Sequence, residues 1–227
     1  MARKKTVVLG VVGGTLSVLL IAVLALGAWV LFRPLMSGDY NHTYGDIRTA
    51  DELSQNPLAA MAASVGQPRD AESAEALGNR IANTVEQIDV VRESVDGARQ
   101  SRAGKKDSSL AAQLKDLDEA YAHLSKTFAA WHEDDYPHIA YAARQCLGES
   151  RDDCRAAVET LSDTSPDDPA LAEVVAASEK VAQGAGRGAL DGAVDGLAER
   201  VEKLWEPIPG QLAEITAYLG EHGEIDR

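Results

Sequence analysis

The sequence lacks the motifs that mark the common enzyme classes. It contains no glycine-rich phosphate-binding loop, no G-x-S-x-G nucleophile turn and no paired-cysteine metal ribbon. It also has no alternating apolar and polar stretch of useful length, which is the pattern of a half-buried strand. These absences favour an all-α fold and a non-enzymatic role, and they point to no cofactor.

Basic residues are few and unevenly placed. Four of the 22 (Arg3, Lys4, Lys5 and Arg33) lie at or before residue 33, whereas all 36 acidic residues follow residue 38, so the chain beyond residue 33 has a net charge of −18. Such a surface repels polyanions, so we expect no nucleic-acid partner. The charge serves solubility outside the cell, or it attracts a cationic partner or divalent ions.

Charge is missing altogether from Thr6 to Phe32, a run of 27 residues. About 20 apolar residues in a helix cross a bilayer, and an excess of basic residues before the span keeps the N-terminus in the cytoplasm. The sequence therefore predicts a cytoplasmic segment (1–5), a single transmembrane helix (6–33) and an extracytoplasmic remainder at the cell membrane. A cleaved signal peptide is the alternative, since Ala22–Ala28 offers small residues, but the apolar run continues beyond them.

Gly10 and Gly14 form a small-xxx-small pair in this span, which is typical of closely packed membrane helices. Residues 34–69 follow, interrupted by three prolines and three glycines. We expect a linker there, through which no long helix runs, with a short helix at most over Leu58–Val65.

Residues 70–222 have the periodicity of a helical bundle, with residues 223–227 as a tail. Two segments, about 71–102 and 109–133, each carry apolar residues at alternating steps of three and four. The short turn between them, where Gly104 breaks the first helix and Asp107 or Ser108 caps the second, predicts an antiparallel helical hairpin. The first seam comprises Leu77, Ile81, Thr84, Ile88, Val91, Val95 and Ala98, and the second Leu110, Leu114, Leu117, Tyr121, Leu124, Phe128 and Trp131.

Shorter helices are predicted beyond the hairpin. They cover about 137–147, a segment opening at Asp152 or Asp153, 166–184, 187–205 and 210–219. The only two cysteines, Cys146 and Cys154, lie on either side of the first corner. An even cysteine count in an oxidising compartment predicts a disulfide that clamps this corner. Zinc, which would need two further ligands, and free thiols are the alternatives.

The densest polar cluster runs from Trp131 to His138. His132, Asp134 and His138 are weak candidates for metal ligands because imidazole and carboxylate both bind transition metals. The alternative is a polar loop in which Asp134 or Asp135 caps the following helix. It is favoured because the two histidines lie six residues apart, whereas in the metalloprotease helix motif they lie four apart.

Glycine recurs every fourth residue at Gly184, Gly188, Gly192 and Gly196. Each glycine inside a helix costs about 1 kcal/mol relative to alanine, so the stripe calls for an explanation. One explanation is that a second helix, from this chain or a partner, docks closely at Gly188, Gly192 and Gly196. The other explanation is that the start of this helix is poorly packed.

Taken together, these features predict a membrane-anchored extracytoplasmic interaction protein. Its role would be that of an accessory or scaffolding component of a cell-envelope membrane assembly, with a protein partner or a second copy held through helix packing. A small-ligand-binding or sensory domain is the alternative, and a metal-binding enzyme using the His132–His138 cluster is a more remote one.

Overall fold

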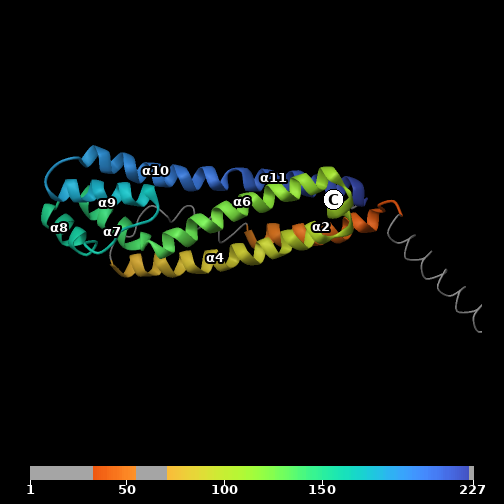
Figure 1. The fold of residues 1–227 in the computed structure, drawn as a ribbon, viewed down its shortest axis with the longest axis horizontal. Helices are drawn as coiled ribbons and strands as arrows, with labels where there is room; N and C mark the ends of the chain where they lie inside the picture. Colours follow the sequence, from red (N-terminus) through yellow and green to blue (C-terminus); the bar gives the residue numbers. More distant parts are fainter. Residues whose placement is uncertain (1–32, 55–70, 225–227) are drawn as a thin grey trace, which may run out of the picture. The chain divides into compact units, whose positions relative to one another are not determined.

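The computed structural model describes residues 33–54 and 71–224. The chain divides into two compact units between Met36 and Ser37, and every helix described below belongs to the second unit (Figure 1). Within the described ranges the secondary structure is helical and no strand occurs. The predicted all-α fold class is therefore confirmed.

The predicted hairpin is the spine of this unit. Helix α4 (Ala71–Gln100) packs along α6 (Ser108–Glu133). The two helices are antiparallel, because Asp89 meets Ser125 whereas Arg92 and Arg99 meet Asp118, further back along α6. Every residue of both predicted seams is buried, so the periodicity identified the core correctly.

The turn of the hairpin differs from the prediction. Gly104 does not break the first helix; it lies inside a one-turn helix, α5 (Arg102–Lys106), and the break falls at Ser101. The Ser101 hydroxyl accepts a hydrogen bond from the Gly104 N–H and so caps α5. Gly104 is needed for close approach, because a Cβ there would lie 2.2 Å from the Ala98 carbonyl oxygen. Asp107 caps α6, as expected.

Part of the predicted 34–69 linker is a helix, which corrects that prediction. Helix α2 (Ser37–Ser54) packs against α4 and against the C-terminal helix of the chain. Its buried residues, spaced by threes and fours, are Tyr40, Thr43, Ile47, Ala50 and Ser54. Gly38 and Gly45 have open space where a Cβ would lie, and burial of the opposite face offsets their low helix propensity. The bundle therefore begins near residue 37 rather than 70.

Three short helices follow the hairpin: α7 (Tyr136–Leu147), α8 (Arg151–Glu159) and α9 (Pro169–Ala182). They pack on one another near the start of α4 and the end of α6 (Figure 1). The N-cap of α8 is Ser150 rather than Asp152 or Asp153. Cys146 and Cys154 form the predicted disulfide between α7 and α8, and both residues are buried.

The last two helices run back along the hairpin. Helix α10 (Arg187–Trp205) packs against α9 and α7, and α11 (Pro207–Gly223) against α2 and α6. The predicted start of the last helix at Gly210 was three residues late. Pro207 and Pro209 lie in its first turn. A backbone N–H has no intrahelical acceptor there, so proline, which lacks the N–H, costs no hydrogen bond.

None of the helices in residues 33–54 and 71–224 combines the length and apolarity that a membrane crossing requires. The run Thr6–Phe32, with Gly10 and Gly14, lies outside the described residues, as do residues 1–5, the segment containing Leu58–Val65 and residues 225–227. The predictions made for those segments stay predictions.

Candidate functional site

The polar cluster at Trp131–His138 is divided among structural contacts. The Asp134 carboxylate accepts hydrogen bonds from the backbone N–H groups of Asp167 and Asp168, at 3.0 and 2.8 Å. Asp135 occupies the N-cap position of α7 without a side-chain cap bond, and its carboxylate instead meets His138 Nδ1 at 2.7 Å. Among the described residues, no three His, Cys, Asp or Glu side chains gather closely enough to hold a metal ion. His132, Asp134 and His138 therefore do not form a common site there.

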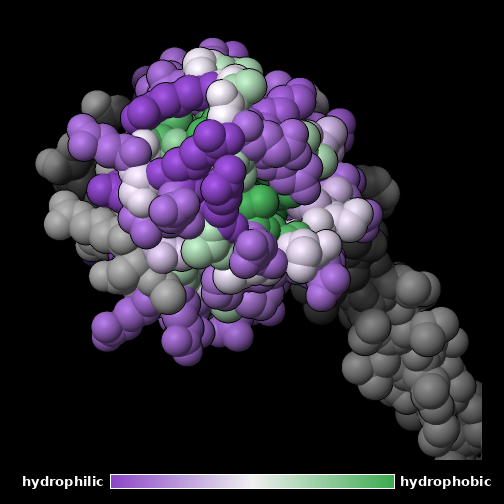
Figure 2. Space-filling view, turned by 90° about the vertical axis from the view of Figure 1, so that its left-hand side faces the viewer, coloured by the Kyte–Doolittle hydropathy of each residue, from purple (hydrophilic) through white to green (hydrophobic). Residues whose placement is uncertain are grey.

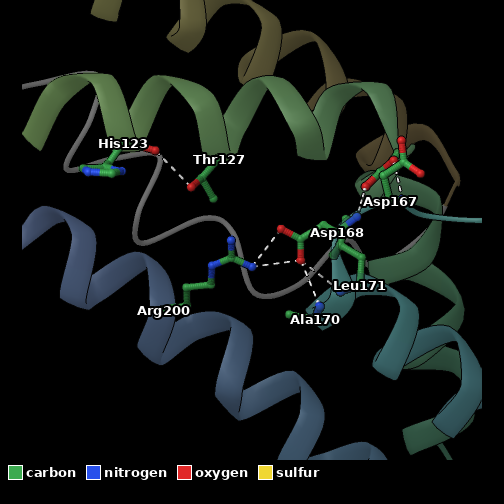
Figure 3. Close-up of polar contacts among 8 residues, drawn as sticks. His123, Thr127, Asp167, Asp168, Ala170, Leu171 and Arg200 are labelled. Atoms are coloured by element: carbon green, nitrogen blue, oxygen red, sulfur yellow. Dashed lines mark hydrogen bonds and ion pairs between the residues drawn. The ribbon is translucent and has the colours of Figure 1, made fainter. Parts of the chain in front are cut away.

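A second polar group joins the same region to α10 (Figure 3). Asp168 caps α9 by accepting from the N–H groups of Ala170 and Leu171. Its two carboxylate oxygens also lie 2.8 Å from one guanidinium nitrogen of Arg200. Asp168 is buried, so this ion pair is part of how α9 holds α10 rather than an open site.

At the opposite end of the bundle, Asp107 joins three helices. One carboxylate oxygen accepts from the N–H groups of Ser109 and Leu110, and the other accepts from the hydroxyls of Tyr40 and Tyr218, at 2.9 and 2.8 Å. Burial alone would raise the pKa of Asp107, but these four hydrogen bonds outweigh it and lower the pKa below its ordinary value. The carboxylate is fully committed to protein donors.

The glycine stripe of α10 lies on the surface. Gly188, Gly192 and Gly196 are exposed, and the space where each would carry a Cβ is empty to at least 4 Å. Gly184 is different: its φ of +99° favours glycine, and the Arg151 guanidinium lies over it. Nothing in the described part of the chain therefore packs on the three helical glycines, and their place in the helix has no internal explanation there.

A pocket of about 410 Å³ lies between α7, α9 and α10. Its walls are mostly apolar, with small side chains where the helices face each other; they include Tyr136, Ala140, Ala143 and Leu147 of α7, Val174 of α9, and Val194, Leu197 and Ala198 of α10. Figure 2 looks onto the end of the bundle that α7, α8 and α9 occupy and shows small apolar areas recessed between hydrophilic residues. The pocket is large enough for a small organic molecule.

Two charged residues and one hydroxyl add polar groups to this pocket. Asp195 of α10 is exposed and makes no hydrogen bond or ion pair with any described residue, whereas Arg144 of α7 is already engaged in an interaction. Burial raises the pKa of the Tyr136 hydroxyl, so it stays protonated at neutral pH. Among the described lining residues, Asp195 is thus a charged group without a partner.

This pocket could not be predicted from the sequence. Its residues come from three helices, and each looks like an ordinary alanine, valine or leucine of a helix seam. No family model, no curated protein and no solved structure matches the chain.

Proposed function

We propose that this protein is a single-pass membrane protein whose helical bundle lies outside the cytoplasm. There it acts, without catalysis, as an accessory or scaffolding component of a cell-envelope membrane assembly. The uncharged run Thr6–Phe32, with three basic residues before it, supports the anchor and its orientation. The Cys146–Cys154 disulfide fits an oxidising compartment.

The open glycine face of α10 is the observation on which the interaction role rests. Gly192 and Gly196, in the interior of α10, together cost about 2 kcal/mol of helix propensity relative to alanine, and no described residue packs in the space that the three glycines leave. A partner helix lying across Gly188, Gly192 and Gly196 would make use of that space, because missing side chains allow two backbones to come close enough for dense van der Waals contact. The same reasoning extends the proposed contact to Gly10 and Gly14 in the membrane span.

Two substitutions of Gly192 test the proposal. Gly192→Ala adds one methyl group and raises helix propensity, so association should persist and the bundle should gain up to about 1 kcal/mol. Gly192→Leu puts a bulky side chain on the face and should weaken association without unfolding the bundle, because the site is open in the isolated chain. Association is measured by cross-linking and pull-down of the full chain in mild detergent.

Gly45→Leu is the matched control, since Gly45 is also an exposed helical glycine with open space around it, but on α2. It should leave association unchanged. If Gly192→Leu associates like the unaltered chain, the glycine face is not the contact. If the protein is always recovered alone and monomeric, the accessory role itself is refuted.

The topology has its own test. Sequencing the N-terminus of the mature protein should find the chain uncleaved. A mature chain that starts after Ala25 or Ala28 would identify a signal peptide instead.

Small-ligand binding is the second candidate function, and the pocket between α7, α9 and α10 is what favours it. Val194, Leu197 and Ala198 line this pocket from another side of α10 than the three glycines, whereas Asp195 lies beside the glycine face, three residues from Gly192.

A further inference from the structure

We infer that the pocket between α7, α9 and α10 binds a small cationic amphiphile. The apolar body of the ligand fills the pocket, and its amine lies beside Asp195. This inference rests on the second candidate function, small-ligand binding at this pocket, and it does not depend on the membrane anchor.

The size of the pocket sets the size of the ligand. The pocket measures about 410 Å³ and is partly open to solvent, since Asp195 and Ala198 in its lining are exposed. An apolar cavity of roughly 150 Å³ is already enough to bind benzene. The pocket therefore accepts a molecule with an aromatic ring and a short alkyl chain.

The walls select an apolar body. The lining includes Ala140 and Ala143 of α7 and Leu197 and Ala198 of α10. The hairpin seam, by contrast, is filled by leucine, isoleucine and aromatic residues. The space thus arises where small side chains oppose one another, and burying an apolar ligand there gains about 25 cal/mol for each Å² removed from water.

The charges select the sign of the polar group. Asp195 lines the pocket and makes no ion pair or hydrogen bond with any residue in the described ranges. Arg144, the cation among the described lining residues, has an interaction of its own and keeps its positive charge, so the unpaired carboxylate is the group that a ligand can pair with. The whole chain has a net charge of −14, which raises the local concentration of cations around it. Both observations favour an ammonium group over a carboxylate.

The experiment compares three probes that share one apolar body: 4-phenylbutylammonium, 4-phenylbutanol and 4-phenylbutyrate. Each is titrated into the full chain in mild detergent, with the alanine methyl groups labelled for NMR. Saturable shifts of the Ala140, Ala143 and Ala198 methyl signals locate the ligand in the pocket, because a probe dissolved only in the micelle moves none of them. The ammonium should bind about two- to five-fold more tightly than the alcohol, which is the range for an exposed ion pair, and the butyrate most weakly.

Two sets of variants separate the pocket from the charge. Asp195→Asn should remove the difference between ammonium and alcohol while leaving the alcohol affinity unchanged. Ala140→Leu combined with Ala198→Leu should abolish the Ala143 shift with all three probes, because leucine side chains enter from both walls. Ala189→Leu, an exposed alanine of α10 outside the pocket, should bind like the unaltered chain.

Several results would overturn the inference. These are the absence of any saturable shift, equal affinity for the three probes, tighter binding of the butyrate, and binding that survives the double leucine variant. Loss of binding in Ala189→Leu would also overturn it, because the loss would then follow from a disturbed α10 rather than from a filled pocket.

Discussion

Replacing Asp107 tests whether one carboxylate holds the end of the bundle together. It receives two backbone N–H groups at the start of α6 and two tyrosine hydroxyls, Tyr40 from α2 and Tyr218 from α11. We expect Asp107→Ala to destabilise the bundle far more than the loss of an ordinary helix cap.

The magnitude follows from the bonds that are lost. Removing an N-cap side chain costs about 1 kcal/mol, and a hydrogen bond to a charged group is worth about 1.5–3 kcal/mol. Because Tyr218 is only half-buried and its hydroxyl can turn to water, we take about 1–1.5 kcal/mol for each tyrosine. Asp107→Ala should therefore cost about 3–4 kcal/mol, and Tyr218→Phe about 1–1.5 kcal/mol. Asp107→Asn keeps the cap and should fall between them.

The assay is denaturant unfolding of the full chain, followed by circular dichroism. The reasoning is wrong if Asp107→Ala costs no more than about 1 kcal/mol, since that is the value of the cap alone. A pH series gives a second test. Because the folded pKa of Asp107 is lowered, its contribution is present above the unfolded value of about 3.9 and is lost as the pH falls through the folded value. Asp107→Asn should remove this part of the acid dependence.

Two further substitutions test the corner and the turn. Replacing Cys146 and Cys154 with serine should lower the free energy of unfolding by about 2.5 kcal/mol, the chain-entropy value for so short a loop. Mass spectrometry of the unreduced protein should show the two cysteine peptides linked. Two free thiols in protein from its native compartment would contradict the disulfide. Gly104→Ala should cost more than about 2 kcal/mol, as overpacking against backbone does, because its Cβ would meet the Ala98 and Arg99 carbonyl oxygens. Gly45→Ala has open space and should stabilise the bundle by about 0.5–1 kcal/mol, so equal effects of the two would refute the packing argument.

The helices that the sequence predicted well are those with strong seams. In α4 and α6, large apolar residues recur at steps of three and four over many turns, and every predicted seam residue is buried. Burial of a continuous apolar stripe dominates helix stability in proteins, so the periodicity of such a segment is a sufficient guide. The hairpin could therefore be predicted with its partner and direction.

Helix α2 was missed because its seam is weak. Tyr40, Thr43, Ile47, Ala50 and Ser54 keep the right spacing, but only Ile47 is strongly apolar. The helix also contains two glycines, Gly38 and Gly45. The spacing was the signal that was available, and composition concealed it. What stabilises α2 is the surface offered by α4 and α11, which a local pattern cannot reveal.

The candidate sites were predictable only where one segment carries the whole feature. The disulfide and the glycine face depend on positions within one stretch of chain, and both lie where the spacing put them. The Asp134 and Asp168 contacts join segments more than 30 residues apart, and the pocket needs three helices to exist. The spacing of residues within one segment contains no information about contacts between distant segments.

The pairing of α2 with α11 affects the order in which the protein can be completed during synthesis. Tyr40 is made early, whereas Tyr218, which shares Asp107 with it, follows roughly 180 residues later, a delay of about 9–36 s at 5–20 residues per second. During that interval α2 packs on α4 but lacks α11, so the side of α2 that α11 covers is open to chaperones and proteases. A premature stop before Pro207 would make this state permanent, and quality control would then recognise the product by its N-terminal helix, although the damage lies at the other end of the chain.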